Sequence, residues 1–193
     1  MIHGGLADDM NAERFWATPG IIDRLVGLGW HVHAPDRETT PASWKTAAEE
    51  MARHLDGPTI VVAGSNGVSV GVRLAIDHPE LVSRLVLLWP ATAGDARVDR
   101  TVPERARHLV SGDTIRGVSD AELARLVAPA CVMAASPEDA HHQHRTVDRL
   151  VTLLGATRSR GAFPEPPHPR FAEHLESFVA ALVELLGLSL IHI

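Results

Sequence analysis

The stretch Thr59-Ile60-Val61-Val62-Ala63-Gly64-Ser65-Asn66-Gly67 decides the fold of this chain. β-favouring and apolar residues run directly into a cluster of small residues around a serine, and an apolar helix-like segment, Val68 to Ile76, follows. This order predicts a strand, a sharp turn and a helix. Such a turn presents the serine hydroxyl at the carboxyl end of a buried strand, and the small residues allow the helix to pack closely. The chemistry that this arrangement serves is acyl transfer by an activated serine.

Two serines compete for the nucleophile position. The literal Gly-x-Ser-x-Gly pattern is Gly67 to Gly71, which contains Ser69. The strand ends before Ser65, however, and Ser69 would lie one turn inside the following helix, where a hydroxyl bonds back to a backbone carbonyl. We therefore predict Ser65 as the nucleophile, with Ser69 or a purely structural turn as the alternatives.

The neighbouring motifs resemble the α/β-hydrolase superfamily. Residues 75–91, Ala-Ile-Asp-His-Pro-Glu-Leu-Val followed by Leu-Val-Leu-Leu-Trp-Pro-Ala, are similar to the helix, turn and strand after the nucleophile in that family. His3-Gly4-Gly5 resembles the family's oxyanion-hole turn. In the family the nucleophile precedes this His-Pro by roughly a dozen residues, which fits Ser65. The resemblance implies an α/β fold with a mostly parallel, doubly wound sheet.

The spacing of apolar residues, together with the glycine and proline residues that interrupt it, predicts alternating strands and helices. Such alternation implies a parallel sheet covered on both faces, with the site at the carboxyl ends of its strands. Residues 91–127 are polar and weakly periodic, and they occupy the place of a small cap or lid. The predicted strands are 30–33, 59–63, 85–88, 130–135 and 156–161. The predicted helices are 19–28, 41–55, 68–76, 102–110, 119–127, 146–154 and 171–186.

The resemblance implies a serine, acid and histidine triad in that chain order. The acid follows the strand at 130–135, where Asp139 is the favoured candidate because Asp139-x-x-His142 resembles a motif common there. Glu138 and Asp95 are the alternatives. For the base, His168 lies in a proline-rich loop before the final helix, where the family carries its histidine. His174 competes, but it falls within the helix.

The resemblance also suggests residues around the reacting centre. The backbone N–H groups of Gly5 and Asn66 are the expected oxyanion donors. Trp16 and Trp89 are candidates for walls of an acyl pocket, although either fits the core equally well. A histidine cluster, His141, His142 and His144, stands at a predicted helix start without ligands at a metal-site spacing. We expect no metal and no cofactor.

Composition is that of one globular domain, which we place at residues 1–187. The 193 residues are 45% hydrophobic and 22% charged, and the net charge of -6 gives no reason to expect nucleic acid as a partner. Only Cys131 is present, which excludes an intrachain disulfide. Without an apolar span of transmembrane length or a signal peptide, a cytoplasmic protein away from membranes is expected.

Both ends of the chain depart from the expected family pattern. Only Met1 and Ile2 precede the His3-Gly4-Gly5 turn, so we expect the natural protein to begin upstream, and a central strand to be missing. Residues 188–193, Leu-Ser-Leu-Ile-His-Ile, match the translation of a sequencing adapter and are interpreted as a cloning or assembly scar.

These features together predict a serine hydrolase that cleaves an ester or similar acyl compound of small size. A carbon-carbon bond hydrolase or an acyltransferase on the same triad is the alternative, because the pocket and not the triad sets that choice. A non-catalytic, ligand-binding relative is the third possibility. It is motivated by three departures from the family pattern, at Ala63, Gln143 and Pro167.

Overall fold

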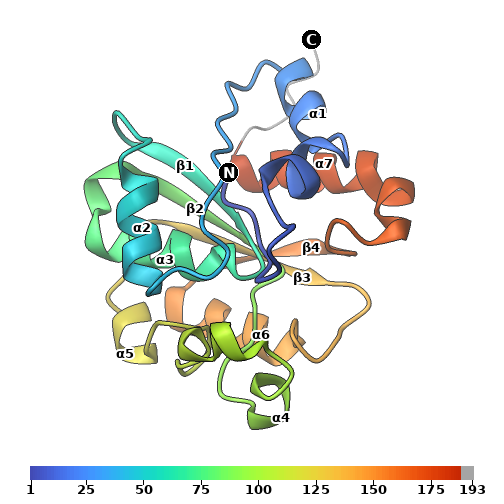
Figure 1. The fold of residues 1–193 in the computed structure, drawn as a ribbon. Helices are drawn as coiled ribbons and strands as arrows, with labels where there is room; N and C mark the ends of the chain where they lie inside the picture. The colour runs from blue at the N-terminus through green and yellow to red at the C-terminus, as the bar shows by residue number, and fades with distance from the viewer. Residues whose placement is uncertain (188–193) are drawn as a thin grey trace.

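A computed structural model describes residues 1–187 and shows a parallel four-stranded sheet (Figure 1). The strands follow the order of the chain across the sheet, and each pairs in parallel with its neighbour. The strands are β1 (Thr59–Gly64), β2 (Val82–Leu88), β3 (Ala130–Ala135) and β4 (Thr157–Phe163). All four carboxyl ends therefore meet at one edge of the sheet.

Helices cover both faces of this sheet (Figure 1). On one face lie α2 (Trp44–Ala52), α3 (Gly67–Asp77), α5 (Asp120–Leu123) and α6 (His144–Leu154), and on the other lie α1 (Ile21–Gly27) and α7 (Leu175–Leu186). The remaining elements are α4 (Ala96–Asp99) and the short η1 (Glu13–Ala17), η2 (Pro79–Leu81), η3 (Glu104–Leu109) and η4 (Pro169–His174).

Alternation along the strands builds two hydrophobic cores. On β2, Leu85 and Leu87 pack into the core on the α3 side, whereas Val86 and Leu88 pack into the core on the α7 side. All four side chains are fully buried. Both faces of the sheet are covered, so the buried strands consist of continuous runs of apolar residues in the sequence.

Residues at the start of the chain lie along the free edge of β1. Ile2 forms a parallel bridge with Ala63, in which its N–H donates to the Val62 carbonyl at 2.8 Å and its own carbonyl accepts from Gly64 at 3.0 Å. These bonds hold the following His3-Gly4-Gly5 turn at the carboxyl end of β1.

The observed elements correct several predicted bounds. The predicted strand at 30–33 is wrong, because these residues join no ladder and Ile2 occupies the position beside β1. The predicted helix at 41–55 is the shorter α2, and that at 171–186 divides into η4 and α7. Residues 91–127 hold only short helices, α4, η3 and α5.

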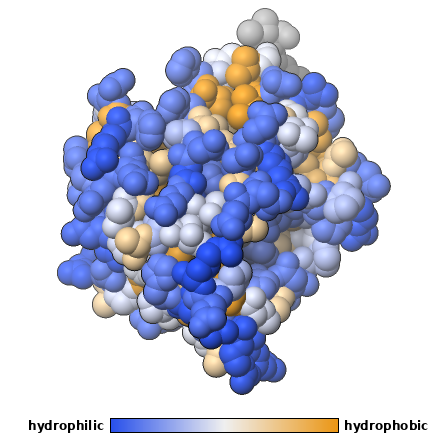
Figure 2. All heavy atoms as spheres, viewed as in Figure 1, coloured by the Kyte–Doolittle hydropathy of each residue, from blue (hydrophilic) through white to orange (hydrophobic). Residues whose placement is uncertain are grey.

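The visible surface is mainly hydrophilic, with apolar atoms gathered near α1 at the top of the view (Figure 2). The large apolar side chains that are exposed include Val26 and Leu28, at the end of α1. Among residues 1–187, no helix combines the length and the apolar character needed to cross a bilayer. The interpretation of residues 188–193 as a scar lies outside the described residues.

Candidate active site

Ser65 sits on a sharp turn between β1 and α3. Its φ of 50° lies in the left-handed region, which non-glycine residues rarely adopt and which is costly unless the surroundings enforce it. The Ser65 N–H donates to the Leu88 carbonyl at 2.9 Å, so the turn is fastened to the end of β2. The residue is 3% exposed.

Glycines allow close approach on both sides of this turn. A Cβ on Gly64 would lie 2.7 Å from the Phe15 ring, and one on Gly67 would lie 2.6 Å from the carbonyl oxygens of Ile2 and His3. Gly4 in turn lies against the Ser65 side chain, because a Cβ there would be 2.6 Å from that of Ser65. The turn that carries Ser65 and the His3-Gly4-Gly5 turn are therefore packed directly together.

The histidine that reaches Ser65 is His142, on the loop between β3 and α6. Its Nε2 lies 2.9 Å from the Ser65 hydroxyl oxygen, and its Nδ1 lies 3.0 Å from Oδ2 of Asp139. His142 is 8% exposed. A hydroxyl, an imidazole and a carboxylate thus form one continuous hydrogen-bonded chain.

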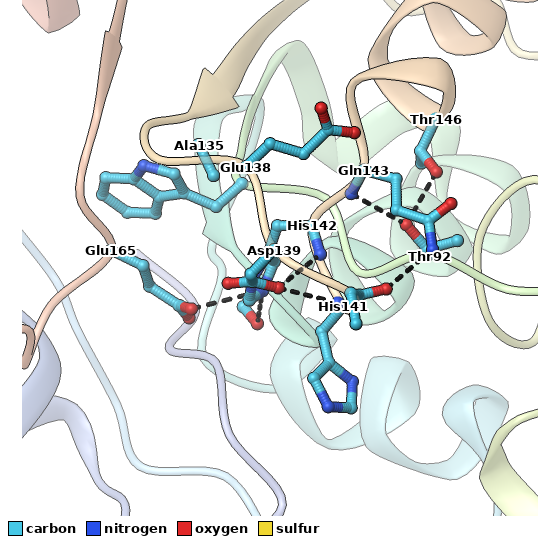
Figure 3. Close-up of polar contacts among 12 residues, drawn as sticks. Thr92, Ala135, Glu138, Asp139, His141, His142, Gln143, Thr146 and Glu165 are labelled. Atoms are coloured by element: carbon cyan, nitrogen blue, oxygen red, sulfur yellow. Dashed lines mark hydrogen bonds and ion pairs between the residues drawn. The ribbon is translucent and has the colours of Figure 1, made fainter. Parts of the chain in front are cut away.

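Asp139 also holds the backbone of the loop that carries His142. Its Oδ1 accepts from the N–H groups of His141 at 2.7 Å and His142 at 3.0 Å. The loop is fastened at its far end as well, since Gln143 N–H donates to the Thr92 hydroxyl at 3.1 Å (Figure 3). These bonds fix where the His142 ring lies.

A second carboxylate, that of Glu165, approaches the same imidazole from the loop after β4 (Figure 3). Its Oε2 lies 3.2 Å from His142 Nε2, the nitrogen that also contacts Ser65. The Glu165 side chain is 23% exposed. The ring therefore has a carboxylate at each nitrogen.

The charges around His142 shift the pKa values of all three groups. Burial favours the neutral imidazole, but the carboxylates of Glu165 and Asp139 outweigh burial and raise the pKa of His142. The hydrogen bond from the His142 ring holds the pKa of Asp139 well below its usual range. Burial raises the pKa of the Glu165 carboxyl.

The structure does not bring His168, the predicted base, to Ser65. Its Nδ1 instead accepts from the Arg170 N–H at 3.2 Å, and it caps the start of η4 on the exposed surface. The chain turns inward two residues after β4, at Glu165, and His168 lies beyond that point. His174 packs edge-on against the Phe163 ring, with 6.3 Å between the ring centres.

The sequence contained a signal for His142, because Asp139-x-x-His142 places the two side chains on one turn. From the sequence we use that spacing only to select the acid, and we treat His141, His142 and His144 alike. His141 and His144 do contact other groups, the Thr101 hydroxyl at 3.3 Å and the Ala135 carbonyl at 2.9 Å. Nothing in the sequence singled out Glu165.

Of the three acids considered, only Asp139 contacts the imidazole that meets Ser65. Glu138 accepts from the His144 N–H at 2.8 Å. Asp95 accepts from the Arg97 N–H at 3.0 Å and from the Gln143 amide at 3.2 Å. Both alternatives therefore have other structural partners.

Arg37 fixes the turn that was expected to supply an oxyanion donor. Its guanidinium donates to the carbonyls of His3 at 2.9 Å and Gly5 at 2.7 Å. Gly5 has a φ of 82°, a conformation that favours glycine. Within residues 1–187, no acceptor meets the N–H of Gly5 or of Asn66.

The two tryptophans considered as pocket walls lie in the core. Trp16 and Trp89 are fully buried in the aromatic cluster on the α7 side, with Phe15, Phe171 and Phe178. Trp89 also donates its indole N–H to the Phe163 carbonyl at 2.9 Å. This placement is the alternative that the sequence had left open.

The described residues show no other site of comparable chemistry. No group of three or more His, Cys, Asp or Glu side chains in residues 1–187 is arranged to hold a metal ion. A cavity of about 550 Å³ lies beside the other end of β1, lined by residues that include Trp30, His33 and Leu55. Ser65 does not line that cavity.

Comparison with known proteins rests on structure alone. No family model and no curated protein matches this chain. Among solved structures, a putative non-heme bromoperoxidase, BpoC, from Mycobacterium tuberculosis H37Rv is 15% identical with a TM-score of 0.74, over 96% of this chain and 91% of that one. A meta-cleavage product hydrolase, CumD, from Pseudomonas fluorescens IP01 is 17% identical with a TM-score of 0.72, over 96% and 89%.

A third solved structure is that of an α/β-hydrolase from an environmental sample. MGS-MChE2, an α/β-hydrolase enzyme from a metagenome of lagoon sediments at Mar Chica, Morocco, is 18% identical with a TM-score of 0.68, over 95% of this chain and 87% of that one. Identities this low establish the arrangement of the backbone and not the reaction. With its parallel sheet, its helices on both faces and Ser65 at the turn after β1, this chain has the α/β-hydrolase fold.

Proposed function

We propose that this protein is a serine hydrolase that cleaves an ester or similar acyl compound. The observation that carries the proposal is the chain of contacts from Ser65 through His142 to Asp139, at 2.9 Å and 3.0 Å. This arrangement supplies a nucleophile, a base within reach of its proton and a carboxylate that orients the base.

The proposed reaction follows from this geometry. His142 Nε2 takes the hydroxyl proton as Ser65 Oγ bonds to the acyl carbon, and Asp139 stabilises the imidazolium that forms. The imidazolium then protonates the leaving group, and water attacks the acyl-enzyme with His142 again as the base. The proton taken from water returns from His142 to Ser65 Oγ as the acid product leaves, which restores the starting state.

The N–H groups of Gly5 and Asn66 are the proposed oxyanion donors. Both lack an acceptor within residues 1–187, and both lie in turns packed against the Ser65 side chain or next to it. Arg37 supports one of them through the Gly5 carbonyl, and Arg116 fixes the other through a 2.8 Å bond to the Asn66 side chain. Donors that are already oriented stabilise the developing charge without reorganisation.

A small-molecule substrate agrees with the limited structure of residues 91–127, which forms only short helices over the site. The solved structures of this fold include a meta-cleavage product hydrolase and the thioesterase domain from the curacin biosynthetic pathway. Both names describe hydrolytic activities. We therefore propose simple acyl esters as the first substrates to test.

The nucleophile is tested by comparing Ser65→Ala with Ser69→Ala. The first variant should lose fluorophosphonate labelling and lower kcat/KM for p-nitrophenyl butyrate by about a thousandfold or more, because it removes the attacking atom. Ser69 lies inside α3 with a buried hydroxyl that meets no partner within the described residues, so its variant should keep most of the activity. Labelling that persists in Ser65→Ala would contradict the proposal.

The base is tested by comparing His142→Ala with His168→Ala. Replacing His142 should be nearly as damaging as replacing Ser65, since members of such a set act as a unit. His168 caps η4 on the surface, so its replacement should leave kcat/KM within a few-fold of the wild type. The reverse result would restore the histidine that the family resemblance had suggested.

A further inference from the structure

The position of Glu165 cannot be explained by the proposed triad alone. His142 Nε2 lies 2.9 Å from Ser65 Oγ and 3.2 Å from Glu165 Oε2, while Nδ1 is occupied by Asp139. One nitrogen thus has two oxygen partners. An imidazole nitrogen either accepts one hydrogen bond through its lone pair or donates one N–H, so its two partners compete.

The competition depends on one proton. When the ring is neutral and Nδ1–H donates to Asp139, the lone pair of Nε2 and the ionised Glu165 carboxylate both face the Ser65 hydroxyl, which can donate its one proton to either of them. When the ring carries a second proton, Nε2–H donates to the Glu165 carboxylate. Ser65 then has no base. The same heavy-atom arrangement therefore has an inactive and an active protonation state.

We propose that Glu165 is a positioning residue that acts through His142: its carboxylate holds a proton on Nε2 in the resting protein and so sets the pH above which Ser65 is activated. This inference rests on the proposed function. Activation releases that proton to solvent, and the Ser65 hydroxyl proton then moves to Nε2 as Oγ bonds to the acyl carbon.

The charges that surround the ring favour this arrangement. Asp139, from the loop after β3, and Glu165, from the loop after β4, both stabilise the imidazolium, and together they raise the pKa of His142 against the effect of burial. Arg116, from the segment before α5, opposes them, and the burial that raises the pKa of the Glu165 carboxyl acts in the same direction as Arg116. His141 lies beside the ring, and burial lowers its pKa, so it stays neutral over more of the pH range.

The local chain path explains how Glu165 reaches this position. Phe163, the last residue of β4, pairs with Ala135 of β3, and its carbonyl accepts from both the Ser136 N–H at 2.9 Å and the Trp89 indole at 2.9 Å. These bonds fix the end of β4 two residues before Glu165. Glu165 therefore lies on a loop, but only two residues from a strand end whose backbone is fastened by these hydrogen bonds.

The test is the pH dependence of kcat/KM for p-nitrophenyl butyrate in Glu165→Gln. Removing the negative charge beside Nε2 destabilises the imidazolium, so the midpoint of the rise in activity with pH should move lower by about one unit or more. At a pH well below the wild-type midpoint, each protein's kcat/KM is expressed as a fraction of its own plateau value. This fraction should be about tenfold larger in the variant than in the wild type. Glu165→Asp keeps the charge, so the pH of its midpoint should lie between those of Glu165→Gln and the wild type.

The control is Glu173→Gln, a surface carboxylate of η4, which should leave the midpoint unchanged. An unchanged midpoint in Glu165→Gln would overturn the inference while leaving the Ser65 and His142 results intact. If Glu165→Gln turns over too slowly to measure, the His142 ring is titrated by NMR in the wild type and the variant. The same downward shift is expected there, and its absence would again overturn the inference.

Discussion

At the scale of the residue, the site depends on backbone positions that tolerate only particular side chains. Ser65 holds a left-handed φ of 50°, and Gly67 two residues later leaves no room for a Cβ against the carbonyls of Ile2 and His3. Both restrictions act on the same pair of turns. The small residues that first drew attention in the sequence are therefore required by the approach of two backbone segments, and not only by the tightness of one turn.

This close approach predicts the effect of Gly67→Ala. The new methyl group would meet backbone oxygens at 2.6 Å, so the His3-Gly4-Gly5 turn must move, and with it the proposed oxyanion donor. We expect the free energy of unfolding to fall by about 1–3 kcal/mol. We expect kcat/KM for the ester to fall by a larger fraction of its wild-type value, because the moved turn carries the proposed oxyanion donor. Denaturant melts and kcat/KM measure the two effects. Gly27→Ala is the matched control, because nothing lies within 4 Å of its Cβ position.

At the scale of the element, α5 is joined to the helix that follows Ser65. Ser119 and Glu122 form a capping box at the start of α5, and the Glu122 carboxylate also accepts from Arg73 of α3 at 2.9 Å. Arg73 donates in addition to the Gly117 carbonyl at 2.8 Å. Residues 117–122 are therefore held to α3 by hydrogen bonds from the charged Arg73 side chain.

The same bonds predict a pH-dependent contribution to stability. Hydrogen bonds from Arg73 and Ser119 lower the pKa of Glu122 from 4.5 to about 2. Its stabilising effect is then fully present above the ordinary carboxyl pKa and is lost as the pH falls toward 2. Glu122→Gln should lower the free energy of unfolding by about 1–2 kcal/mol at pH 7, and the difference from the wild type should shrink on acidification.

Denaturant melts at pH 7 and at pH 3 would measure this difference. Glu104→Gln is a suitable control, since Glu104 is exposed and its side chain makes no hydrogen bond or ion pair within residues 1–187. A difference between Glu122→Gln and the wild type that grows at low pH would contradict the assignment.

At the scale of the whole molecule, the sheet could be predicted because its signals are local. The strands predicted at 59–63, 85–88, 130–135 and 156–161 correspond to β1 to β4, and the α/β-hydrolase fold that the motifs suggested is confirmed. The strand predicted at 30–33 failed, because an apolar segment becomes a strand only when a neighbour is free to pair with it.

The grouping of side chains around Ser65 was less predictable, because it depends on contacts between distant parts of the chain. Two hydrogen bonds position the loops that face Ser65. One joins Gln143 to Thr92 and holds the loop after β3, and the other joins Trp89 to Phe163 and holds the end of β4. Residue spacing carries no information about such contacts. The family resemblance therefore suggested His168, whereas the structure places His142 and Glu165 at that position.

The environment of Trp89 gives the site an optical property. The protein has four tryptophans and no tyrosine, so indole dominates its near-ultraviolet emission. Trp89 directly follows β2, whose last carbonyl accepts from Ser65, and its indole N–H donates to the Phe163 carbonyl two residues before Glu165. One fluorophore is thus attached to both segments that meet at His142. We therefore expect a ligand that moves either segment to change the Trp89 emission, which a fluorescence titration of the native sequence would measure.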